Sequence, residues 1–214
     1  MKTATKYAED MKSLFKRLLK EHKPEPLEPL EPLKALVKGA MSYDVSDARA
    51  DEAMRHIDRE FVDLNELRVA TDLEIQELLG VRYPQIEKRV AMITQSLNYI
   101  FEREHTMNLE RLNTISRRDA RQFLRDLPEI HPFVEAFVML YSFDGNCVPL
   151  DEQMLAYLRQ QGVVDEKLSL EETQKSVEHH LKGEECYDFY RTVRQAAHEG
   201  SAPESGTKRK AKAK

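Results

Sequence analysis

Leu127-Pro128-Glu129-Ile130-His131-Pro132-Phe133 opens the most informative part of this chain of 214 residues. An apolar run follows at 134–143, and the segment closes with Pro149-Leu150-Asp151. A polar, basic stretch at 116–125 comes before it. Prolines at the turn and apolar residues at helical spacing predict two helices joined by a tight hairpin at about 116–143, followed by a helix that begins just after Asp151.

This segment resembles the helix-hairpin-helix of the endonuclease III-like DNA glycosylases (HhH-GPD superfamily), whose hairpin reads Leu-Pro-Gly-Val-Gly. In that family a catalytic lysine follows two residues after the hairpin, and a catalytic aspartate follows eighteen residues after the lysine. The lysine's place is Phe133 here, and the aspartate's place is Asp151 with no gap. Glu129 and His131 stand where the family has glycines. The resemblance implies an all-α, endonuclease III-like two-lobed fold with a base pocket between the lobes.

Glycosylase chemistry needs a carboxylate near the sugar of the extruded base, and a lysine where the enzyme also cleaves the strand. Asp151 is therefore the candidate catalytic residue, whereas Phe133 has no amine. An active enzyme of this kind would be a monofunctional glycosylase of base excision repair without lyase activity. Asp151 also suits the N-cap of the helix at 152–161, a role that needs no chemistry. Whether the chain is an enzyme stays open.

The resemblance also suggests which residues meet DNA. Glu129, Ile130 and His131 occupy the hairpin, where backbone amides hold a phosphate in the family. A carboxylate at Glu129 weakens such a contact, and a protonated His131 would compensate for it, although a structural histidine is the alternative. Tyr43 lies in the region where the family inserts a polar side chain into the gap left by the flipped base.

Charge is distributed unevenly along the chain. The formal net charge is −5, yet residues 1–24 and 201–214 each carry +4, which leaves −13 on the body between them. Residues 82–125 hold nine Lys and Arg against five acids, and they include the candidate DNA contacts Arg117, Arg118 and Arg121. The tail offers Lys208, Arg209 and Lys210 for a nonspecific tether to DNA. The simpler interpretation is that the basic residues of 82–125 lie on solvated helix faces and that the tail only adds solubility.

Helical periodicity and proline positions predict four regions. An amphipathic helix occupies 1–23, a proline-rich connection 24–32, a helical HhH-GPD-like domain 33–200, and a disordered basic tail 201–214. About ten helices are expected, with capping boxes at Thr71 and Ser169 and with Pro84 in the first turn of a long helix.

Cofactor and metal sites are not expected. Two cysteines, Cys147 and Cys186, are too few for the four-cysteine iron–sulfur cluster of many endonuclease III relatives. His179 and His180 are adjacent, so they face apart on a helix and form no zinc pair. Because no signal peptide or membrane segment is evident, we expect an intracellular protein of the cytoplasm or nucleoid, with DNA as partner. A catalytically inactive DNA-binding or protein-interaction module is the alternative function, and an unrelated helical adaptor is a third.

Overall fold

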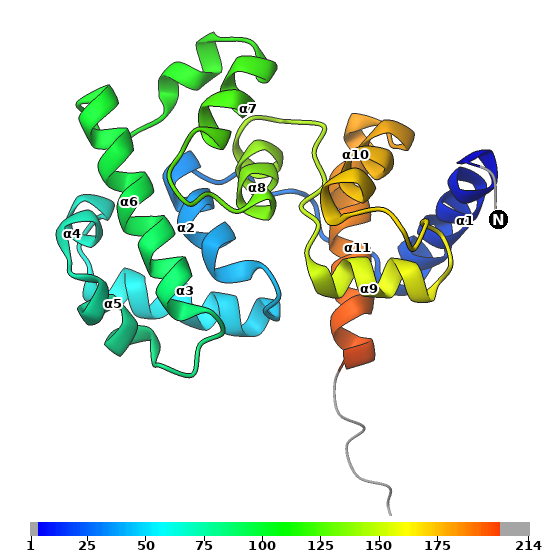
Figure 1. The fold of residues 1–214 in the computed structure, drawn as a ribbon, viewed down its shortest axis with the longest axis horizontal. Coiled ribbons are helices and arrows are strands. Elements are labelled where there is room, and N and C mark those ends of the chain that lie inside the picture. Colours follow the sequence, from blue (N-terminus) through cyan, green and yellow to red (C-terminus); the bar gives the residue numbers. More distant parts are fainter. Residues whose placement is uncertain (1–3, 202–214) are drawn as a thin grey trace, which may run out of the picture.

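A computed structural model describes residues 4–201, and within this range the chain forms helices and their connections without a strand (Figure 1). The prediction of an all-α fold is confirmed. The elements are α1 (Ala4–His22), α2 (Pro32–Ser42), α3 (Asp47–Glu60), α4 (Leu64–Val69), α5 (Asp72–Leu79), α6 (Ile86–Glu104), the 3-10 helix η1 (Glu110–Thr114), α7 (Arg117–Arg125), α8 (Pro132–Ser142), α9 (Glu152–Gln160), α10 (Leu170–His180) and α11 (Gly183–Ser201).

The helices gather into two lobes, which confirms the predicted two-lobed arrangement. Helices α2 to α8 form the central lobe, in which α2 packs against α3, α6 and α8. The terminal lobe joins the two ends of the chain, because α1 and α9 both pack against α11, and α10 packs against α9. Figure 1 shows the two lobes side by side, with the proline-containing segment 23–31 running between them.

Local capping signals set several helix starts as predicted. Thr71 and Glu74 form a reciprocal capping box at the start of α5, and Ser169 and Glu172 form another at α10. Ser116 caps α7 by accepting a hydrogen bond from the Asp119 amide. Each cap satisfies amides that a helix start otherwise leaves without a partner.

One local expectation was wrong, and one helix was not predicted. Pro84 does not lie in the first turn of α6, because the helix begins at Ile86 and Gln85 takes a left-handed conformation with φ 51°. Helix α4 was not predicted: its six residues are too few to show a helical period, and only Leu67 among them is buried. Asp63 starts this helix by accepting hydrogen bonds from two of its amides.

Segment 23–31 has no helix, as its prolines require, and it is anchored where the Leu30 amide donates to the Tyr141 carbonyl at 3.0 Å. Among the described residues, no helix combines the length and apolar character needed to cross a bilayer.

Candidate functional site

Asp151 starts α9 and is completely buried, at 0% exposure. Its Oδ1 accepts a hydrogen bond from the Met154 amide at 2.8 Å, the N-cap contact that the sequence suggested. Its Oδ2 accepts from the Asp44 amide at 3.0 Å and lies 3.3 Å from Nη1 of Arg194. Both carboxylate oxygens are therefore engaged within the protein.

Arg194 of α11 links the lobes around this carboxylate. Its guanidinium is 1% exposed and contacts Asp47 Oδ1 at 2.6 Å, as well as the carbonyls of Ser42 at 2.8 Å and Val45 at 2.5 Å. Asp44, Asp47, Asp151 and Arg194 make up what we call the interlobe ion cluster. Asp44 in the α2–α3 turn and Asp47 at the start of α3 belong to the central lobe, whereas Asp151 and Arg194 belong to the terminal lobe.

Electrostatics favour the charged forms of Arg194 and Asp47 within this cluster. Burial would lower the pKa of Arg194, but the neighbouring Tyr190, Asp47 and Asp151 outweigh it and raise that pKa above its usual value. Burial likewise acts to raise the pKa of Asp47, yet Arg194 and Arg191 hold it below its usual value. An arginine buried in this way is stabilised only while its carboxylate partners and carbonyl acceptors stay in place.

Phe133, at the position of the family's lysine, is part of the core. It is 0% exposed, and its ring lies 5.9 Å from that of Phe137 and 6.1 Å from that of Tyr190. The Arg194 guanidinium lies 5.7 Å from its ring centre. Phe133 is on α8 and Tyr190 on α11, so aromatic side chains pack between the lobes around the guanidinium of Arg194.

Tyr43 does not lie at the surface, where it could stack on a base. It is 3% exposed and stacks in parallel on His131 at 4.3 Å. The guanidinium of Arg89 also lies over the Tyr43 ring, 3.6 Å from the ring centre. Arg89 is itself fully buried and donates to the carbonyls of Ala40 and Tyr43 at 2.5 and 2.7 Å.

The turn between α7 and α8 forms without a glycine. Glu129 takes the left-handed conformation with φ 55°, and its side chain is exposed. Ile130 is half-buried and packs on the core. His131 caps α8, since its Nδ1 accepts from the Phe133 amide at 3.2 Å. Burial, together with the charge of Arg89, lowers the pKa of His131, so near neutral pH it supplies no positive charge for a phosphate.

The buried His131 makes stability pH-dependent. Its folded-state pKa lies below the unfolded value of about 6.5, so its contribution is complete above that pH and is lost as the pH falls through the folded-state pKa. We expect the free energy of unfolding to decline as the pH falls below about 6.5, and His131→Asn to reduce the steepness of that decline. Burial also lowers the pKa of His198, which should contribute to the same decline. Urea unfolding at a series of pH values tests this, and an unchanged profile in the variant would contradict it.

Helix α7 presents the basic face that the sequence indicated. Arg117, Arg118 and Arg125 are exposed and line a groove of about 550 Å³. Arg121 also lines it, but it is half-buried and pairs with Glu135 at 2.5 Å and Glu178 at 3.2 Å. Its role is thus partly structural. The candidates Lys208, Arg209 and Lys210 lie outside the described residues.

Within residues 4–201, no three His, Cys, Asp or Glu side chains are placed to hold a metal ion. Cys147 and Cys186 are buried free thiols, and burial raises their pKa to about 12 and about 11. The buried structural role of Arg194 was not predicted from the sequence, and Arg89, which was counted in the basic stretch 82–125, is buried and does not face solvent. The only available signal was the position of Arg194 on the same helix face as the apolar Tyr190 and Ala197.

Comparisons with known proteins identify the fold. No family model and no curated protein matches the sequence. Among solved structures, a trapped covalent complex of endonuclease III with DNA matches with a TM-score of 0.70 and 13% identity, over 91% of this chain and 85% of that chain. A Clostridium acetobutylicum 8-oxoguanine glycosylase/lyase bound to double-stranded DNA matches with a TM-score of 0.70 and 15% identity, over 91% and 71%. The H. pylori 3-methyladenine DNA glycosylase matches with a TM-score of 0.67 and 13% identity, over 93% and 99%. The predicted endonuclease III-like fold is confirmed.

Proposed function

We propose that this chain acts on or near DNA in base excision repair, as a DNA-binding module that does not itself excise a base. The observation that carries this proposal is the state of Asp151, which is completely buried with both carboxylate oxygens engaged. Such a carboxylate reaches a sugar only if the two lobes separate. Phe133 offers no amine for covalent attack, and its buried ring packs against the Arg194 guanidinium that contacts Asp151.

DNA contact is supported by the arginines of α7. Glu129 places a carboxylate at the hairpin tip and the Pro132 nitrogen bears no proton, so the hairpin is a poor phosphate site. Arg117 and Arg118 line an exposed groove at the start of α7, the helix that precedes this turn. Guanidinium groups bind phosphate with two hydrogen bonds, and such contacts give affinity that does not depend on sequence. The DNA complexes among the structural neighbours support contact with DNA in general.

Replacing Arg118 with glutamine should weaken duplex binding uniformly across sequences and reduce the salt slope by about one. Arg118 is suited to this test because it is exposed and has no ion-pair partner within residues 4–201. Fluorescence anisotropy at several salt concentrations measures both effects. Arg59→Gln is the matched control, since Arg59 is also exposed but lies at the end of α3. An equal loss in both variants would show only an effect of net charge and would overturn the assignment to α7.

Excision assays separate the proposal from its alternative. We expect no released base from duplexes containing uracil, ethenoadenine or 8-oxoguanine. A monofunctional glycosylase is the second candidate, favoured by the position of Asp151 at the start of α9 with the family's spacing. In that case the wild type releases base and Asp151→Asn abolishes release, while asparagine still caps the helix. Base release by the wild type would refute the non-enzymatic proposal, and release that survives in Asp151→Asn would refute a catalytic Asp151.

A further inference from the structure

Two grooves flank α7 and share two of its arginines. The first is the groove of about 550 Å³ described above. The second has a volume of about 280 Å³ and is lined by α7, the start of α8 and α10. Arg121 and Arg125 line both grooves. Because α7 belongs to the central lobe and α10 to the terminal lobe, the two grooves together form a surface that crosses the lobe boundary, which we call the α7–α10 surface.

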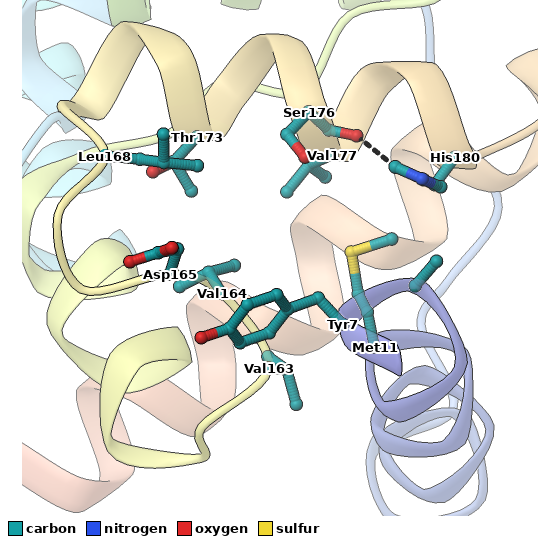
Figure 2. A pocket seen from close by; sticks show the side chains of 11 residues that line it. Tyr7, Met11, Val163, Val164, Asp165, Leu168, Thr173, Ser176, Val177 and His180 are labelled. Carbon is teal, nitrogen blue, oxygen red and sulfur yellow. Dashed lines mark hydrogen bonds between the residues drawn. The ribbon is translucent and has the colours of Figure 1, made fainter. Parts of the chain in front are cut away.

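Helix α10 presents different side chains on its two sides. Thr173, Val177 and His180 line a cavity of about 170 Å³ on the side toward α1 (Figure 2). Gln174 and Lys175 lie on the opposite side of the helix, in the groove that α10 shares with α7. The single lysine of α10 thus lies on the α7–α10 surface.

A buried carboxylate orients Arg125. Glu135 is 3% exposed, and it accepts hydrogen bonds from Nε of Arg121 at 2.5 Å and from Nε of Arg125 at 3.3 Å. Arg121 also bonds to Glu178 through both of its Nη atoms. By contrast, the two Nη atoms of Arg125 have no partner within residues 4–201, and its side chain is 45% exposed. Arg125 is therefore held through Nε while the end of its guanidinium remains free to bind an anion.

Charge narrows the ligand class to anions. Arg117 already pairs with Asp144 at 2.9 Å. Three cations of the surface keep free donors within residues 4–201, namely Arg118, Arg125 and Lys175. Against them stands the exposed carboxylate of Glu171, while its neighbour Glu172 is held in the capping box of α10. The cations with free donors thus outnumber the opposing carboxylate.

The surface has no aromatic ring on which a base could stack. Among the described residues that line the two grooves, none is Phe, Tyr, Trp or His, and the apolar contribution comes from Ile130, Pro132 and Met139. Proteins that hold unpaired bases stack them on aromatic side chains. The surface therefore suits the phosphate backbone of duplex DNA, which is contacted without recognition of a base.

We propose that duplex DNA lies across the α7–α10 surface, with its phosphates bound by Arg118 and Arg125 of the central lobe and by Lys175 of the terminal lobe. Arg125 binds a phosphate through both Nη atoms, and Glu135 is the positioning residue that holds it. This inference rests on the proposed contact between DNA and α7, and it adds a contact from the second lobe. A ligand that contacts both lobes favours the arrangement in which they are packed together, so bound DNA disfavours any opening toward Asp151.

The test is fluorescence anisotropy of the full chain with an undamaged DNA duplex at several salt concentrations. Lys175→Gln should weaken binding and reduce the salt slope by about one, because one phosphate contact is lost. Lys167→Gln is the matched control and should leave the slope unchanged, since Lys167 is also exposed but lines neither groove. Glu171→Gln removes the opposing carboxylate and should tighten binding more than Glu166→Gln, whose carboxylate is exposed outside both grooves.

The orientation of Arg125 has its own test. Arg125→Gln should reduce the salt slope by about one. Arg125→Lys keeps the positive charge and hence the slope, but an ammonium cannot bond to Glu135 through Nε and also bind a phosphate through two Nη atoms. We therefore expect Arg125→Lys to bind the duplex more weakly than the wild type at every salt concentration.

The possible outcomes separate this inference from the proposed function on which it rests. If Arg118→Gln weakens binding but Lys175→Gln behaves like Lys167→Gln, contact between DNA and α7 stands and its extension onto α10 is wrong. If Arg125→Lys binds as tightly as the wild type, the role of Glu135 in positioning Arg125 is wrong. A wild-type protein that does not bind the duplex would overturn both the inference and the proposed function.

Discussion

Replacing Arg194 with methionine should lower the free energy of unfolding by about 3–5 kcal/mol, the range for breaking a buried ion pair on one side. Methionine fills similar space but leaves Asp151 buried without its cation and leaves the carbonyls of Ser42 and Val45 without their donor. Urea unfolding followed by circular dichroism measures the loss.

Arg191→Met is the matched control for this prediction. Arg191 lies on the same helix and contacts Asp47 at 2.8 Å, but its side chain is 36% exposed. Solvent screens such a pair, so we expect a loss of about 1 kcal/mol or less. Equal losses in the two variants would mean that the buried cluster contributes no more than a surface ion pair.

Introducing a lysine at the aligned position by Phe133→Lys should lower the free energy of unfolding by at least about 3–5 kcal/mol, the range for truncating a buried phenylalanine. The new ammonium would be buried near the Arg194 guanidinium, which lies 5.7 Å from the present ring centre. The lysine ammonium and the Arg194 guanidinium would repel each other in that space, and water would hydrate neither charge. The lost packing against Phe137 and Tyr190 adds to the cost.

The chemistry of that variant is equally testable. We expect no covalent complex of Phe133→Lys with abasic DNA after borohydride treatment, because the position lies inside the core and not in an open pocket. Val62→Lys serves as a stability control, since Val62 is 92% exposed and should tolerate the change. A stable, trappable Phe133→Lys protein would show that the space between the lobes opens readily.

Local patterns predicted most of the architecture. Thr71 and Ser169 fixed two helix starts because a capping box depends on residues only three positions apart. The spacing of Phe133 and Asp151 identified the hairpin and the start of the following helix. By contrast, α4 was not predicted because its six residues are too few to show a helical period, and an N-cap residue such as Asp63 does not by itself indicate a helix.

The state of the candidate site could not be predicted from sequence. Arg194 pairs with Asp47 across 147 positions, and no local pattern marks either residue as a partner of the other. The stacking of Tyr43 on His131 is equally nonlocal. Sequence reasoning could say that Asp151 suits both a cap and a catalyst. Only the packing of two lobes showed that its second oxygen is also engaged.

The left-handed turn at Glu129 shows how this hairpin is held in place. A residue with a side chain in this conformation costs about 1 kcal/mol relative to glycine, so the surroundings impose it. Buried Leu127 lies on one side of the turn, while Ser96 donates to the Pro128 carbonyl and the His131 amide contacts the sulfur of Met92. Contacts with α6 thus determine the backbone conformation of this turn, and the residue types within the turn do not determine it alone. A search that relies on the glycine signature would pass over chains of this kind, although a comparison of backbones finds them at once.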